Sequence, residues 1–151
     1  MGLLSLAGCG FAPAYGPGGP GERLRGRLDA EAPDTPDGFR LRARLEDRLG
    51  RAESPAAVLS VEPWVEVAEA GITPTGAITR YDLQGRAAWR LVASSGVALA
   101  QGEVSAFTGY SATGTTVATR AAQDDARERL MVLLADEIVA RLLALPAEAL
   151  P

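Results

Sequence analysis

The first regular pattern along the chain is an alternation of hydrophobic and polar residues. The segment 22–32, ERLRGRLDAEA, separates them onto two sides: Leu24, Gly26, Leu28 and Ala30 against Arg23, Arg25, Arg27 and Asp29. A period of two residues is typical of a strand with one buried face. We therefore predict a first strand over 22–32, with its arginines on the exposed side.

Three later segments alternate in the same way and predict three more strands. In 56–71, AAVLSVEPWVEVAEAG, Trp64 falls on the polar side. Pro63 has no N–H to donate, which indicates a sheet edge or a bulge there. The clearest alternation covers 77–92, where Tyr81, Leu83, Ala87, Trp89 and Leu91 oppose Arg80, Asp82, Gln84, Arg86 and Arg90. A short SSG turn then leads to 97–112, so these last two strands form a hairpin.

Two segments have the spacing of helices. Residues 34–51 open with capping residues and a proline, place leucines four apart at 41, 45 and 49, and end at Gly50. The LRARL repeat inside it is also compatible with a strand, but the spacing and the glycine favour a helix. The C-terminal segment 115–145 spaces its apolar residues four apart until Pro146: Ala122, Ala126, Leu130, Leu134, Ile138 and Leu142.

The predicted order is β-α-β-β-β-α, which indicates an α+β fold. Four strands and two helices with one apolar side each make a two-layer sandwich, with both helices on one face of a mostly antiparallel sheet. The other face stays open. It would carry Trp64 and six arginines, interrupted by acidic residues: Arg23, Arg25, Arg27, Arg80, Arg86 and Arg90, with Asp29, Glu62, Glu66 and Asp82.

The single cysteine of the chain lies near its start. Residues 1–8, MGLLSLAG, are apolar but too short to span a bilayer, which takes about 20 residues. They resemble the end of a signal peptide without its positively charged start, so we expect the start to be truncated or misassigned. The sequence from Leu6 to Cys9 is similar to a bacterial lipobox. That resemblance implies cleavage before Cys9 and acylation of Cys9, whereas the alternative is an incidental free cysteine. Gly10, in place of an aspartate, favours the outer membrane.

Residues 9–21 are rich in glycine and proline and are predicted to be a tether between this anchor and the folded domain. We expect one domain over 22–146 and a short tail over 147–151, because 15.7 kDa suits a single core.

Composition excludes several function classes. Fifteen arginines against 19 acidic residues give a net charge of −4, which argues against a broad nucleic-acid-binding surface. The chain has no histidine and one cysteine, and its glycines do not form a phosphate-binding loop. We therefore expect no catalysis, no metal and no cofactor.

Several stretches together resemble one protein family. They are CGFAPAYG at 9–16, DGFRLRARLEDRLG, AITRYDLQGRAAWRL, SAFTGYSATGTTVATRAAQDDARERL and the terminal ADEIVARLL. In this order they are similar to LptE, the lipopolysaccharide-assembly lipoprotein family, in its alphaproteobacterial form. Alanines occupy some usual arginine or leucine positions of the opening motif. The resemblance implies a lipid-anchored outer-membrane protein, facing the periplasm or inside the lumen of an LptD-type β-barrel in a 1:1 complex. It also implies a role in assembling that barrel and in delivering lipopolysaccharide.

Two sets of residues are candidates for these contacts. Arginine binds phosphate with paired hydrogen bonds, so lipopolysaccharide could bind at Arg80, Arg86, Arg90, Arg23, Arg25 and Arg27. The alternative is a solvated face neutralised by its acidic residues. Trp64, Phe107 and Tyr110 are candidate contacts with the barrel, or buried side chains. A competing function is a free-standing periplasmic lipoprotein that acts as an envelope assembly factor or ligand carrier.

Overall fold

A computed structural model describes residues 15–150 of the protein. They form a four-stranded sheet in the order β1-β2-β3-β4. Its strands are β1 (Leu28–Glu31), β2 (Ala57–Ile72), β3 (Ile78–Ala93) and β4 (Ala98–Ser111). β1 pairs parallel to β2, whereas the other neighbours are antiparallel. The predicted α+β class and the mostly antiparallel sheet are confirmed.

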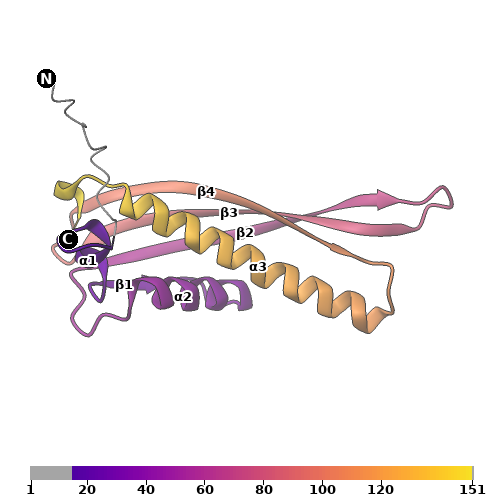
Figure 1. Cartoon of the computed structure of the whole chain (residues 1–151), viewed down its shortest axis with the longest axis horizontal. Coiled ribbons are helices and arrows are strands. Elements are labelled where there is room, and N and C mark those ends of the chain that lie inside the picture. Colours follow the sequence, from indigo (N-terminus) through magenta and orange to yellow (C-terminus); the bar gives the residue numbers. More distant parts are fainter. Residues whose placement is uncertain (1–14, 151) are drawn as a thin grey trace, which may run out of the picture.

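Two helices cover one face of this sheet (Figure 1). α2 (Pro36–Leu49) begins where the Thr35 hydroxyl accepts a hydrogen bond from the Gly38 N–H at 3.1 Å, and it ends at Gly50, whose φ is 75°. α3 (Thr116–Leu143) crosses the sheet diagonally, and Thr115 caps its start. Both helices were predicted, and their capping residues explain why they start and stop there.

The core lies between the sheet and these helices. Of the α3 residues predicted from their four-residue spacing, Ala122 is half-buried and the other five are fully buried: Ala126, Leu130, Leu134, Ile138 and Leu142. Three further α3 residues are also fully buried: Met131, Ala135 and Val139. They pack against alternate residues of β2 and β3, among them Leu59, Leu83 and Leu91. Gly85 of β3 lets α3 approach closely, because a Cβ there would lie 2.9 Å from Leu130 Cγ.

The first predicted strand is wrong in its N-terminal half. Residues Pro20–Leu24 form a short helix, α1, and a turn with Gly26 at φ 68° leads into β1 at Leu28. The helix and turn bury Leu24 and expose Arg23, Arg25 and Arg27, which reproduces the alternation of a strand. These three arginines are therefore not on the sheet face, and α1 was not expected.

Pro63 lies on a sheet edge without a bulge. β1 ends at Glu31, opposite Ser60, so β2 has no neighbour on that side at Pro63. The missing N–H of Pro63 therefore has no energetic cost at this edge of the sheet. The irregularity in β2 comes later, between Glu69 and Ile72.

The molecule is elongated, with different structures at its two ends (Figure 1). At one end lie α1, the start of β1 and a short C-terminal 3-10 helix, η1 (Ala147–Ala149). At the other end β2 and β3 continue as a two-stranded ribbon beyond α2 and α3. Two large apolar side chains of β2 are exposed toward this end: Val67, in a row where β4 still pairs with β3, and Ile72, in the ribbon.

Candidate functional site

The face of the sheet opposite the helices is the candidate site, because no described helix covers it (Figure 1). Strand alternation selects its residues, and the register aligns them in rows across the sheet. Trp64 on β2 is opposite Arg86 on β3, which is opposite Ser105 on β4. The next row places Gln84 opposite Phe107. Three of the six candidate arginines lie on this face.

Those three arginines differ in their surroundings. Arg80 Nε donates to Asp82 Oδ1 at 3.0 Å on the same strand. The guanidinium of Arg86 lies over the Trp64 ring, 5.8 Å from its centroid, in a cation–π contact. Arg90 has no ion-pair partner within residues 15–150. Of the predicted row, Arg90 is therefore the one most available to a ligand.

The charge of the whole face is negative. It holds six carboxylates against three guanidinium groups, a net charge of −3; the carboxylates belong to Asp29, Glu31, Glu62, Glu66, Asp82 and Glu103. A phosphate that approached Arg90 would also meet this acidic surplus. Direct binding of lipopolysaccharide at this face stays a prediction.

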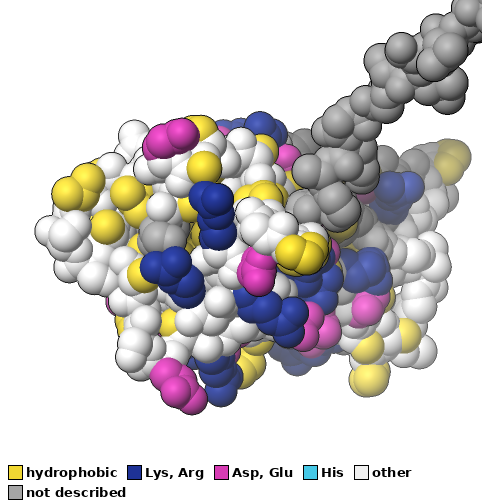
Figure 2. Space-filling model, turned by 60° about the vertical axis from the view of Figure 1, so that its left-hand side comes forward, with side chains coloured by type: hydrophobic (Ala, Val, Ile, Leu, Met, Phe, Trp, Pro, Cys, Tyr) yellow, Lys and Arg dark blue, Asp and Glu magenta, His cyan; other side chains and the backbone are white. Residues whose placement is uncertain are grey.

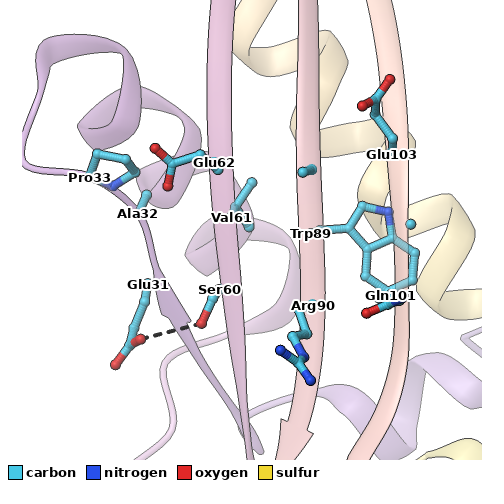
Figure 3. Close-up of a pocket in the computed structure, with 12 residues that line it drawn as sticks. Glu31, Ala32, Pro33, Ser60, Val61, Glu62, Trp89, Arg90, Gln101 and Glu103 are labelled. Carbon is cyan, nitrogen blue, oxygen red and sulfur yellow. Dashed lines mark hydrogen bonds between the residues drawn. The ribbon is translucent and has the colours of Figure 1, made fainter.

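A shallow depression of about 850 Å³ occupies part of the face (Figure 3). Charged and polar side chains from all four strands surround it: Glu31, Ser60, Glu62, Arg90, Gln101 and Glu103. The Ser60 hydroxyl donates to Glu31 at 3.4 Å, which ties β1 to β2 at its edge. The depression is open to solvent, and its lining offers hydrogen bonds and charges of both signs. Apolar groups, among them Ala32, Pro33 and Ala88, make up the rest of the lining, so the depression presents a mixed surface rather than a purely polar one.

The three candidate aromatic residues are divided between the two faces. Trp64 and Phe107 lie on the open face, where they are 39% and 51% exposed. Tyr110 lies on the face with the helices and stacks on Tyr81, with 5.3 Å between ring centroids. Burial there raises the pKa of the Tyr110 hydroxyl above its ordinary value, and the neighbouring Tyr81 adds to the shift. Only Trp64 and Phe107 are placed to contact a partner at the open face.

The other three candidate arginines, Arg23, Arg25 and Arg27, lie at the end of the molecule that carries α1. Cys9, the predicted lipidation site, lies outside the described residues. Tyr15 is the first residue that the structure describes, and its hydroxyl accepts a hydrogen bond from Arg48 Nη2 at 3.2 Å.

Sequence reasoning missed the polar contacts that join α2 to α3. Arg44 donates twice to Asp136, and Arg48 Nη1 donates to Asp136 Oδ1 at 2.9 Å. The hydrogen bond to Asp136 raises the pKa of the Arg44 guanidinium. The bond with Tyr15 is the largest cause of the raised pKa of Arg48. Arginines spaced four apart on α2 were the signal available, but their partner is about 90 residues away.

Within residues 15–150, no group of three or more acidic, histidine or cysteine side chains is arranged to hold a metal ion. Over the same residues, no helix combines the length and the apolar character needed to cross a membrane.

The fold and its uncovered face define a two-layer α+β protein similar to several solved lipoproteins. A candidate lipoprotein of Caulobacter crescentus CB15 is 26% identical, with a TM-score of 0.65 over 82% of this chain and 92% of that one. The minor lipoprotein of Acinetobacter baumannii is 20% identical, with a TM-score of 0.59 over 80% and 92%. Rare lipoprotein B of Shewanella oneidensis is 16% identical, with a TM-score of 0.59 over 77% and 91%.

A family model then identifies the chain more closely. The LptE model, described as lipopolysaccharide-assembly, matches residues 27–142, so the chain belongs to the LptE family. The matched region runs from the turn before β1 almost to the end of α3. A search of curated protein sequences gives no match. The family resemblance seen in the sequence is confirmed, and membership indicates a lipopolysaccharide-assembly protein of the cell envelope.

Proposed function

We propose that this protein is an outer-membrane lipoprotein that partners and plugs an LptD-type β-barrel, supports its assembly and aids delivery of lipopolysaccharide to the outer leaflet. The observation that carries the proposal is the family match over residues 27–142, which includes every strand and both long helices. Catalysis is not part of this function, because the chain has no histidine and its one thiol is assigned to lipid.

The shape of the molecule supports a role as an insert. One sheet face is free of helices, and the β2–β3 ribbon extends beyond them (Figure 1). A protein surrounded by a partner needs contact surfaces on several sides, and these are the surfaces that its own core leaves unused. Trp64 and Phe107 supply large side chains on the open face, of the type enriched at interfaces.

Acylation of Cys9 would hold the protein at the membrane. Several acyl chains give stable attachment, since each buried CH₂ contributes about 0.8 kcal/mol and one chain alone is marginal. Mass spectrometry of the protein isolated from membranes should give a mature chain that begins at an acylated Cys9. A chain with a free thiol and the leader still attached would contradict this anchor.

Affinity isolation tests the partnership. The protein, tagged at its C-terminus and expressed in its own host, is extracted from outer membranes with mild detergent. We expect a large β-barrel to co-purify in a 1:1 ratio. The Cys9→Ser variant separates the anchor from the partnership, because a barrel contact made by the folded domain should survive loss of the acyl chains. Isolation of wild-type protein without a barrel would favour a free-standing periplasmic lipoprotein instead.

A further inference from the structure

The end of the molecule that carries α1 exposes several basic side chains, with acidic ones among them (Figure 2). Arg23, Arg25 and Arg27 are all exposed, and none has an ion-pair partner in the part of the chain that the structure describes. Within residues 20–28 they face a single acidic residue, Glu22. We define these three arginines as the terminal arginine patch. Its local charge is opposite in sign to the net charge of −4 of the whole chain.

The fold holds this patch in place. Leu24 and Leu28 are buried on either side of the patch residue Arg25, so the segment cannot turn its arginines inward. The Gly26 N–H donates to the Leu49 carbonyl at 2.7 Å, and the Arg27 carbonyl accepts from the Ala56 N–H at 2.8 Å. These bonds fasten the segment to the loop after α2. That loop adds Arg51, paired with Glu46, and one more carboxylate, Glu53.

The same end receives the N-terminal segment. Tyr15 is hydrogen-bonded to Arg48 in the last turn of α2. Gly50, two residues further on, lies against Gly26, since a Cβ there would be 3.3 Å from the Gly26 nitrogen. Cys9 lies six positions before Tyr15, a distance of at most about 21 Å along a fully extended chain. A lipid on Cys9 would therefore keep this end of the domain close to the bilayer.

We infer that the terminal arginine patch binds the anionic phospholipid headgroups of the leaflet that holds the acyl chains. This inference rests on the proposed acylation of Cys9. Planar guanidinium groups pair with phosphate through two hydrogen bonds, and basic residues near an anionic surface are attracted within about 10 Å. The acyl chains attach the protein, and the patch holds the end that carries α1 at the headgroups of that leaflet. The arginines of the open face are on a different surface and take no part.

Vesicle flotation of the unacylated protein tests the patch alone. The full chain carrying Cys9→Ser is mixed with vesicles of phosphatidylethanolamine and phosphatidylglycerol at 3:1, or with phosphatidylcholine replacing the phosphatidylglycerol. We expect binding to the anionic vesicles that weakens with salt. Adding R23Q/R25Q/R27Q should reduce that affinity by roughly a hundredfold, about fivefold for each arginine. The matched control, R80Q/R86Q/R90Q, changes the net charge equally and should bind like the parent.

Three results would overturn the inference. The first is equal binding to neutral and anionic vesicles, and the second is an equal loss of vesicle affinity in the two triple variants. The third is that R23Q/R25Q/R27Q loses affinity for lipopolysaccharide but not for vesicles that contain phosphatidylglycerol. All the proteins compared carry the same apolar leader, so its contribution to vesicle binding cancels in the comparison. All six arginines are exposed, and circular dichroism checks that each variant is folded. No barrel or acyl chain is present in this assay, so its failure is distinct from failure of the proposed function.

Discussion

Arg44 on α2 and Asp136 on α3 form a two-point ion pair between the helices. Arg44 Nε donates to Asp136 Oδ1 at 3.0 Å, and Nη2 donates to Oδ2 at 3.1 Å. Arg127 of α3 also pairs with Asp37, near the start of α2. Because both contacts advance in the same direction along each helix, α2 and α3 run parallel. These ion pairs fix how far one helix is shifted along the other, which the apolar contacts alone would leave adjustable.

Replacing Asp136 should destabilise the protein more than replacing a surface carboxylate. In Asp136→Asn, Arg44 keeps only Asp47 as an anionic partner, and Arg48 loses its one ion-pair partner among residues 15–150. We expect the free energy of unfolding to fall by about 1–2 kcal/mol, a value kept modest because the side chain of Asp136 is 34% exposed. Urea denaturation followed by circular dichroism measures the change.

The matched control is Asp47→Asn. Asp47 also accepts a hydrogen bond from Arg44, at 2.9 Å, but it is 68% exposed and lies on the same helix. Its loss should cost less than about 0.5 kcal/mol. If the two substitutions cost the same, the contact between the helices has no special role in stability.

Gly85 should tolerate no side chain while Leu130 is present. A Cβ at this position would lie 2.9 Å from Leu130 Cγ, inside a fully packed core. Gly85→Ala is therefore expected to lower the free energy of unfolding by about 1–3 kcal/mol through overpacking. The double variant with Leu130→Ala provides the control, because the added methyl then fills part of a cavity. Gly85→Ala should cost less in that background, and equal costs in both would contradict the close approach of α3.

The hydrophobic pattern was sufficient to predict the fold class, both long helices, and the two faces of β2 and β3 up to the irregularity after Glu69. It failed at residues 22–27, where a short helix and a glycine turn leave Leu24 buried and Gly26 half-buried between exposed arginines, as a strand would. Periodicity reports burial, and different backbones produce the same burial over six residues. It also could not reveal that β1 pairs parallel to β2, because strand direction depends on the helix that connects the two.

The candidate site was only partly predictable for the same reason. Alternation placed Arg80, Arg86 and Trp64 correctly on one face. It could not show that Asp82 accepts a hydrogen bond from Arg80, or that Arg86 stacks on Trp64, because these contacts depend on side-chain conformation. The ion pairs of Asp136 join residues about 90 positions apart, and no local pattern predicts such pairs.

Stability should fall at alkaline pH because of Tyr110. Burial raises the pKa of its hydroxyl in the folded protein, whereas the unfolded chain titrates near 10. Below pH 10 the group is protonated in both states, and its contribution is fully present. As the pH rises further, the unfolded chain loses the proton first, so the free energy of unfolding decreases. Denaturation between pH 8 and 11 measures this slope.

The Tyr110→Phe variant isolates that contribution. Its stability should decrease less steeply above pH 10 than that of the wild type, while the difference between the two stays constant near pH 8. Parallel curves across the whole range would mean that burial of the hydroxyl has no effect on its ionisation.

Lipopolysaccharide binding at the open face should depend mainly on Arg90. Arg80 is paired with Asp82 and Arg86 is stacked on Trp64, whereas Arg90 faces the depression without an ion-pair partner among residues 15–150. We expect Arg90→Gln alone to produce most of the loss of affinity seen in R80Q/R86Q/R90Q, about tenfold for one charge-assisted contact. Titration with purified lipopolysaccharide measures both variants. Unchanged affinity in the triple variant would make this face a solvated surface.

The two exposed aromatic residues of the open face should contribute to barrel capture. Trp64 and Phe107 lie one row apart on β2 and β4, and removing both large side chains deletes the main apolar area of that face. We expect Trp64→Ser with Phe107→Ser to reduce the amount of co-purified barrel at least tenfold, since central aromatic residues commonly contribute about 2 kcal/mol or more to an interface.

The control removes an exposed apolar side chain elsewhere. Val117 is 81% exposed at the start of α3, away from the open face, so Val117→Ser should leave barrel recovery unchanged. Thermal unfolding of each variant checks that the domain remains folded. Equal recovery from the double variant and the wild type would show that the barrel contacts other surfaces, and the exposed β2 residues Val67 and Ile72 would then be the next to test.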